Sequence, residues 1–329
     1  MPLILSILLG FIPMFLFAAF VYWLDRYEKE PRLLLGGAFL WGAVIAAGAA
    51  FLINTILGLG VYYLTGSETA ADVSTTSIIA PVIEETLKGL AVLLVFLLAR
   101  KEFDSVLDGI VYAAITALGF AATENSYYIY TMGYLKDGYA GLAQLAFIRI
   151  FLVGWQHPFY TAFIGIGLAM ARLTRNGGLR VLFPLLGLGA AILTHALHNT
   201  LAQFLSGLEG LALTSLMDWT GWLLLLGFVI FMIWRENQLL HVQLDEELRL
   251  GIITPEQYRA ACSFWKRTGG FFAARDRDLR TQRKRFYQVC AELAHKKNQL
   301  TRMGDEGGNG QIITSLRGEL QQLSIALTG

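Results

Sequence analysis

Charged residues are scarce in this sequence. Only 16% of its 329 residues are Asp, Glu, Lys or Arg, whereas 55% are hydrophobic. Soluble domains carry about 25% charged residues, so this shortage excludes an ordinary soluble fold. The mean hydropathy is +0.52, and the sequence therefore predicts a protein that crosses a membrane several times.

Three other features are absent or rare. The net charge is only +1, which gives no basic excess to favour nucleic acid as a partner. The two cysteines, Cys262 and Cys290, are too few for a disulfide framework, and we expect reduced thiols. The H-E-x-x-H motif of helical zinc proteases is missing. Any metal site would therefore have to be built from several helices.

The charge that is present gathers toward the end of the chain. Residues 1–234 hold 11 Lys/Arg and 14 Asp/Glu, whereas residues 235–329 hold 15 and 11. We therefore divide the chain into a transmembrane domain, 1–234, and a small helical cytoplasmic tail, 235–329. Within the tail, Gly251 is expected to end one helix, and Thr254 and Pro255 to begin the next as N-cap and first residue.

The first part predicts an all-α, polytopic membrane bundle of about seven transmembrane helices, because a span needs about 20 apolar residues. The expected spans are 3–24, 33–64, 77–99, 106–131, 147–171, 180–205 and 211–234. Loops rich and poor in Lys/Arg alternate between them, as the positive-inside rule expects. This alternation predicts a multi-pass protein of the cell membrane with its N-terminus outside and its tail in the cytoplasm. No Lys or Arg precedes the first run, so we expect a retained span rather than a cleaved signal.

Polar residues at membrane depth are confined to four consecutive expected spans. A carboxylate at the bilayer centre costs about 2.5–3.5 kcal/mol, so such residues are kept for pairing, for a wet cavity or for chemistry. They are Glu84, Glu85, Lys88, Glu124, Asn125, Arg149, His157, His195, His198 and Asn199. The spans place Glu84, Glu124, His157 and His195 at a similar depth, about 10–15 Å below the outer surface at 1.5 Å per residue. One shared pocket is therefore predicted.

Simpler interpretations exist for the single members. Glu84 and Lys88 lie four residues apart and could form a structural ion pair. Arg149, near an interface, would ordinarily extend to the lipid headgroups. The set as a whole exceeds what packing needs, and suits a metal site or an acid–base site that activates water. Two alternatives stay open at this point: a proton-coupled transporter, and a non-catalytic membrane scaffold.

Four stretches, in order along the chain, carry a resemblance to a known family. They are "APVIEETLKGL" with E-E-x-x-K, "DGIVYAAITALGFAATENSYYI" with G-F-x-x-x-E-N, "HPFYTAFIGIGLA", and "LTHALHNTL" with H-A-L-x-N. Together they resemble the PrsW family of intramembrane proteases, a distant relative of the CPBP/Abi group that includes the CAAX prenyl endopeptidases. The resemblance covers roughly residues 20–235. Two positions depart from its pattern: Pro158 follows His157, and His198 stands where an aromatic residue is usual.

The resemblance implies an endopeptidase that cuts single-span membrane proteins such as anti-sigma factors, within the lipid bilayer and near its outer face. The catalytic candidates that it carries over are Glu84, Glu85, Glu124, His157, His195 and Asn199, and the supporting ones are Lys88, Asn125 and His198. If a divalent metal such as zinc is used, the expected ligands are Glu124, His157 and His195. A mechanism that relies on glutamate alone stays open.

Our mechanistic hypothesis gives each candidate a role. His157 and His195 either bind a divalent metal or donate to the tetrahedral intermediate. Glu84 is the base that activates water, and Glu85, pointing about 100° away on a helix of 3.6 residues per turn, holds a neighbour or a metal. Glu124 orients a histidine or completes the ligands of the metal. Asn199 is the donor that stabilises the oxyanion.

Overall fold

The computed structural model describes residues 1–329 apart from 26, 28, 206, 264–276, 306–307 and 329. The described residues are mostly helical and include no β-strand, which confirms the all-α prediction. They form two compact units. Unit 1 comprises Met1–Leu24 and Glu30–Phe228, and unit 2 comprises Asp25–Lys29 and Val229–Gly329. The assignment of separate functions to the parts 1–234 and 235–329 stays a prediction.

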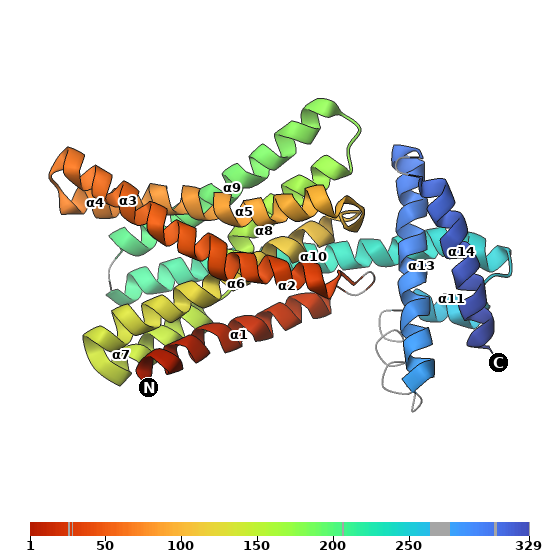
Figure 1. Cartoon of the computed structure of the whole chain (residues 1–329), viewed down its shortest axis with the longest axis horizontal. Helices are drawn as coiled ribbons and strands as arrows, with labels where there is room; N and C mark the ends of the chain where they lie inside the picture. The colour runs from red at the N-terminus through yellow and green to blue at the C-terminus, as the bar shows by residue number, and fades with distance from the viewer. Residues whose placement is uncertain (26, 28, 206, 264–276, 306–307, 329) are drawn as a thin grey trace. The chain divides into compact units, whose positions relative to one another are not determined.

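Unit 1 is a bundle of helices, several of which are preceded or followed by short π-helical turns (Figure 1). Its α-helices are α1 (Pro2–Leu24), α2 (Arg32–Leu40), α3 (Ala47–Thr65), α4 (Glu68–Ser74), α5 (Ala80–Leu98), α6 (Val106–Tyr128), α7 (Leu135–Phe147), α8 (Gln156–Arg172), α9 (Gly177–Phe204) and the first part of α10 (Gly207–Arg249). The π-helical turns are η1 (Trp41–Ala46), η2 (Thr75–Ile79), η4 (Ile129–Tyr134) and η5 (Ile148–Leu152), and η3 (Arg100–Glu102) is a 3₁₀ turn.

Among the described residues, five segments are long and apolar enough to cross a membrane. They are Pro2–Leu24, Arg32–Thr65, Val106–Arg172, Gly177–Phe204 and Gly207–Arg249. The third of them runs from α6 to α8 and so takes in two of the seven expected spans, whereas α5, the third expected span, is not among the five because it carries three charged residues. The count of seven therefore stays a prediction.

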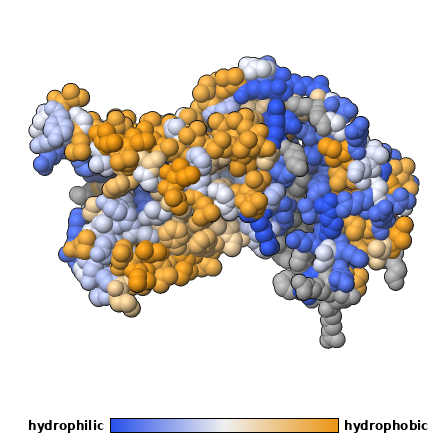
Figure 2. Space-filling view, viewed as in Figure 1, coloured by the Kyte–Doolittle hydropathy of each residue, from blue (hydrophilic) through white to orange (hydrophobic). Residues whose placement is uncertain are grey.

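The apolar side chains of unit 1 face outward as well as inward. Only 22% of the apolar window of Pro2–Leu24 is buried within the protein, and Figure 2 shows hydrophobic residues gathered over α1, α2 and α3. A soluble protein does not expose apolar surface on this scale. The chain is therefore a membrane protein, as its composition predicts.

Helix α6 is the innermost helix of unit 1, and small residues let its neighbours approach. Most of its residues are buried. A Cβ atom on Gly119 would lie 2.0 Å from the carbonyl oxygen of Phe39, and one on Gly109 would lie 2.2 Å from that of Gly165 in α8. Such contacts are how helices pack closely in membranes. They bring α6 and α8, which carry Glu124 and His157, side by side.

Unit 2 contains the second part of α10, α11 (Pro255–Ala261), α13 (Arg277–Met303) and α14 (Asn309–Ala326). The predicted turn is confirmed: Gly251 has a φ of +69°, and Thr254 caps α11 through a capping box with Gln257. Cys262 and Cys290 are both buried, and no disulfide joins them.

Candidate active site

Helix α5 brings three charged side chains into the interior of unit 1. The exposed fractions of Glu84, Glu85 and Lys88 are 6%, 0% and 0%. The Lys88 ammonium lies 2.6 Å from Glu85 Oε1 and 3.9 Å from Glu84 Oε2. Two buried carboxylates thus share one ammonium, and this face of α5 keeps an excess of negative charge.

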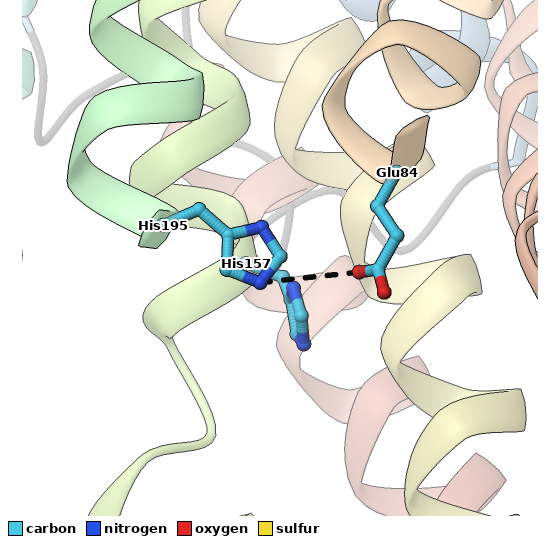
Figure 3. Close-up of side chains that lie close together, drawn as sticks. All are labelled: Glu84, His157 and His195. Atoms are coloured by element: carbon cyan, nitrogen blue, oxygen red, sulfur yellow. Dashed lines mark ion pairs between the residues drawn. The ribbon is translucent and has the colours of Figure 1, made fainter. Parts of the chain in front are cut away.

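His195, on α9, is held by one glutamate and faces the other. Its Nδ1 lies 2.9 Å from Glu85 Oε1, and its Nε2 lies 3.9 Å from Glu84 Oε2. Thr161 on α8 donates to the second oxygen of Glu85 at 2.8 Å. Figure 3 shows the His195 ring facing the Glu84 carboxylate. If Nδ1 carries the proton and donates to Glu85, Nε2 keeps a lone pair on the side of Glu84.

His157, in the first turn of α8, is held on both sides. Its Nε2 lies 2.8 Å from Glu124 Oε2, and its Nδ1 lies 3.3 Å from Lys88 Nζ. An ammonium can only donate, so in this arrangement Nδ1 accepts and Nε2 carries the proton toward Glu124.

Glu124, on α6, is itself fixed by Arg149 of η5. The guanidinium forms an ion pair with Glu124 through Nη2, and its Nε donates to Asn125 Oδ1 at 2.7 Å. It also lies over the ring of Tyr128, 4.3 Å from the centroid. Arg149 is therefore a partner of the buried cluster and does not extend to headgroups as the sequence suggested. Three carboxylates and two fixed cations leave one negative charge for a histidine or a bound cation to offset.

Three of these residues, Glu84, His157 and His195, could hold a metal ion. Each offers one ligand atom, and the three atoms lie within 4.8 Å of one another. Two imidazoles and one carboxylate form a donor set that catalytic zinc sites use. No hydrogen-bond donor among the described residues reaches Glu84 Oε2, although this oxygen is buried. The residues thus fit a divalent metal, with one condition: Lys88 must leave His157 Nδ1 if that nitrogen is to be a ligand.

The remaining predicted residues lie around this cluster. Glu124, expected as a metal ligand, is absent from the group of three and contacts His157 instead. Asn199 donates to the carbonyl oxygen of Thr76 at 2.9 Å, so a role at an oxyanion would require that bond to be exchanged. His198 pairs with Asp218 of α10 at 2.9 Å.

Four further residues of the cluster were not predicted from the sequence. Asn54 on α3 lies 3.4 Å from Glu84 Oε1, and Asp218 lies in a span that seemed almost free of polar groups. Tyr160 donates to Asp218 at 2.9 Å and stacks on the His195 ring, with 5.0 Å between centroids. Thr161 and Tyr160 could have been found, because they follow His157 by four and three residues on one helix.

The region that builds this cluster matches a known family. A family model described as "PrsW family intramembrane metalloprotease" matches residues 30–234, which include every residue of the cluster. The chain belongs to the PrsW family. The resemblance seen in the four motifs is thereby confirmed.

Individual relatives are similar over parts of the chain. Protease PrsW of Clostridioides difficile (strain 630) is 35% identical over 124 residues, which are 38% of this chain and 50% of the relative. That of Geobacillus kaustophilus (strain HTA426) is 27% identical over 47% of this chain and 61% of its own length. That of Bacillus subtilis (strain 168) is 26% identical over 68% of this chain and 89% of its own. The chain thus spans half to three fifths of the first two relatives. No solved structure matches it.

Proposed function

We propose that this chain is an intramembrane endopeptidase whose active site is the cluster of Glu84, His157 and His195. The observation that carries the proposal is the buried oxygen Glu84 Oε2, to which none of the described residues donates a hydrogen bond and which lies 3.9 Å from His195 Nε2. Leaving a buried polar atom unpaired costs about 1–3 kcal/mol, so its persistence calls for a role in function. Because the chain belongs to a family of intramembrane proteases, the reaction we propose for this oxygen is hydrolysis of a peptide bond.

In this proposal Glu84 accepts the proton of the water that attacks the scissile carbonyl. The resulting tetrahedral intermediate collapses when its amine takes up a proton, which the protonated Glu84 is placed to return. Lys88, 3.9 Å from Glu84 Oε2, offsets the negative charge that the attack creates.

His157 and His195 would hold a divalent metal such as zinc, with Glu84 within reach as a third donor. When bound, such an ion supplies a Lewis acid that makes water acidic and polarises a carbonyl. The other residues position these ligands: Glu85 orients His195, and Glu124, fixed by Arg149 and Asn125, orients His157. Asn199 and His198 stabilise the surrounding helices, through the Thr76 carbonyl oxygen and Asp218 respectively.

The substrate in this proposal is a single-span membrane protein such as an anti-sigma factor, cut near the outer face. The N-terminus lies outside the cell membrane and the tail in the cytoplasm. Both statements rest on the resemblance and on the loop charges.

The test is to map new protein N-termini in the membrane and secreted fractions of cells that carry wild type or Glu84→Gln. We expect wild-type cells alone to yield N-termini near one end of single-span proteins. Glu209→Gln is the matched control, because Glu209 is exposed and the chemical change is the same. Identical maps for wild type and Glu84→Gln would contradict the proposal.

A further inference from the structure

Tyr160, on α8, lies among the three histidines of unit 1. Its ring stacks on that of His195, with 5.0 Å between the centroids and 21° between the planes. The rings of His157 and His198 lie 6.2 and 6.1 Å from it. The side chain is fully buried. Tyr160 is therefore an aromatic neighbour that His157 and His195, the two candidate metal ligands, share.

The hydroxyl group of Tyr160 is held by Asp218 of α10. It donates to Asp218 Oδ1 at 2.9 Å, and Asp218 is buried in an otherwise apolar stretch of its helix. A carboxylate at bilayer depth is costly to place there. A phenylalanine at position 160 would offer the same ring face and would need no acceptor. The presence of both polar groups therefore indicates that the hydrogen bond between them has a task of its own.

The stacked ring supplies a restraint on His195 that its contact with Glu85 does not. Glu85 Oε1 lies 2.9 Å from Nδ1 and so fixes one point of the imidazole. One hydrogen bond leaves the ring able to tilt about the bonded nitrogen, and a tilt would move Nε2, which lies 3.9 Å from Glu84 Oε2. A ring packed against one face of the imidazole limits this tilt. Tyr160 can do so because Asp218 holds its other end.

Asp218 has a second partner, which gives a simpler explanation to be tested against this one. His198 Nδ1 lies 2.9 Å from Asp218 Oδ2 and 3.1 Å from Oδ1. This contact joins α9 to α10 directly. If Asp218 served only His198, loss of the Tyr160 hydroxyl group would leave the site unchanged. The two explanations therefore predict different results for variants of Tyr160 and of His198.

We propose that Asp218 and Tyr160 are positioning residues for His195. Asp218 fixes the Tyr160 hydroxyl group, and the Tyr160 ring fixes the imidazole whose Nε2 lies on the side of Glu84. Both residues act through His195 and not on the substrate. The inference rests on the proposed endopeptidase function and deepens it, because it adds α10 to the helices that set the geometry of the site.

The test is a double-mutant cycle in the purified full chain, reconstituted in liposomes with a substrate found by N-terminal mapping. Tyr160→Phe keeps the ring and loses the hydroxyl group, so it should lower kcat about tenfold and leave KM within about twofold. Asp218→Leu should lower kcat by at least as much. Added to Tyr160→Phe, it should cost no more than about a further threefold, because the hydrogen bond is already lost. Asp218→Asn keeps an oxygen that can accept from the hydroxyl group and should recover most of kcat.

Zinc affinity gives a measurement that does not depend on cleavage. His195 is one of the three residues that could hold a metal ion, and a ring that tilts is a poorer ligand. Calorimetric titration of Tyr160→Phe and of Asp218→Leu should therefore show affinity about tenfold weaker than that of wild type. Tyr139→Phe is the matched control, because it loses the same hydroxyl group from an exposed ring. It should change neither kcat nor zinc affinity by more than about twofold.

Three results would overturn the inference. Wild-type kcat and wild-type zinc affinity in Tyr160→Phe would show that the site does not use the hydrogen bond. Fully additive losses in the cycle would show that Asp218 does not act through Tyr160. A loss in His198→Leu as large as that in Asp218→Leu would assign the effect of Asp218 to His198.

Failure of this inference and failure of the proposed function give different results. If Glu84→Gln abolishes cleavage while the cycle shows no coupling, the endopeptidase stands and the positioning role fails. If wild type cleaves no substrate but binds zinc, the endopeptidase fails, and the zinc titrations of the same variants decide the positioning role. If wild type neither cleaves nor binds zinc, both fail together.

Discussion

Two buried glutamates, one in each unit, differ in how completely they are paired. Glu247, in unit 2, is fully buried, and both of its oxygens accept hydrogen bonds. Lys297 lies 2.9 Å from Oε1, and Arg317 donates to Oε1 and Oε2 at 2.7 and 2.8 Å. Glu84, in unit 1, has an amide 3.4 Å from Oε1 and no donor among the described residues at Oε2.

The difference separates a structural carboxylate from a candidate catalytic one. The hydrogen bond with Glu247 raises the pKa of the Arg317 guanidinium above its ordinary value. Both oxygens of Glu247 are thus occupied by donors of the protein. Lys88 Nζ and His195 Nε2 each lie 3.9 Å from Glu84 Oε2, too far to hydrogen-bond. Glu84 Oε2 therefore keeps its capacity to accept a hydrogen bond or to bind a metal ion.

The largest expected effect is that of His195→Ala. Removal of this imidazole should lower cleavage by at least about 10²-fold, because the reacting water loses a neighbouring acid–base or ligand group. Zinc binding by the purified chain, measured by calorimetry, should weaken in parallel. His241→Ala in unit 2 is the matched control and should change neither quantity by more than about twofold. Equal losses of cleavage and zinc binding in His195→Ala and His241→Ala would contradict the distinction between the two units.

Glu85→Gln comes next in expected effect. The amide keeps the shape of the side chain but loses the charge that holds His195 Nδ1 at 2.9 Å. Loss of such a partner typically costs about 10–100-fold in metal affinity or activity. The same calorimetric titration measures the loss of affinity, and an unchanged zinc affinity together with full cleavage would remove Glu85 as the group that orients His195.

Arg149→Ala tests the indirect support that His157 receives through Glu124. Arg149 acts on His157 only through Glu124, so we expect a smaller loss of zinc affinity, about tenfold. Arg149→Lys restores the positive charge, but a lysine cannot contact Glu124 and Asn125 through two separate nitrogens. It should therefore recover only part of the lost zinc affinity. Full recovery by lysine would show that charge alone matters at this position.

Glu247→Gln tests unit 2 and should affect stability instead of cleavage. Replacing a charged acceptor of buried hydrogen bonds costs about 1–3 kcal/mol. Thermal unfolding of the full chain in detergent, followed by helical circular dichroism, should show an earlier transition, whereas cleavage below that temperature stays at the wild-type level. A loss of cleavage at low temperature would mean that the Glu247 network also serves the active site.

The smallest expected effect is that of Arg285→Ala. The Arg285 side chain is 39% exposed and pairs with Glu319 and Glu292. Such a pair is worth about 0–1 kcal/mol, so the same unfolding experiment should detect little change. A destabilisation as large as that of Glu247→Gln would show that exposure does not separate the ion pairs of unit 2.

The sequence predicted the helical class, the family and most of the residues that meet in the cluster, because charged and imidazole groups stand out in apolar helices. It did not predict which of them touch. Arg149 was interpreted as an interfacial residue, since only packing of η5 against α6 reveals its contact with Glu124. Asn54 and Asp218 were overlooked for a related reason: a single polar residue in an apolar run has meaning only once its neighbours are known.

The central claim is that Glu84, whose Oε2 accepts no hydrogen bond from the described residues, performs the reaction, and that the fully paired Glu247 does not. The most direct test is to reconstitute purified wild type, Glu84→Gln and Glu247→Gln in liposomes with a substrate found by N-terminal mapping, and to measure the cleavage rate per folded molecule. We expect Glu84→Gln to fall by about 10²–10⁴-fold and Glu247→Gln to stay within about twofold of wild type. Cleavage by Glu84→Gln at the wild-type rate would contradict the account.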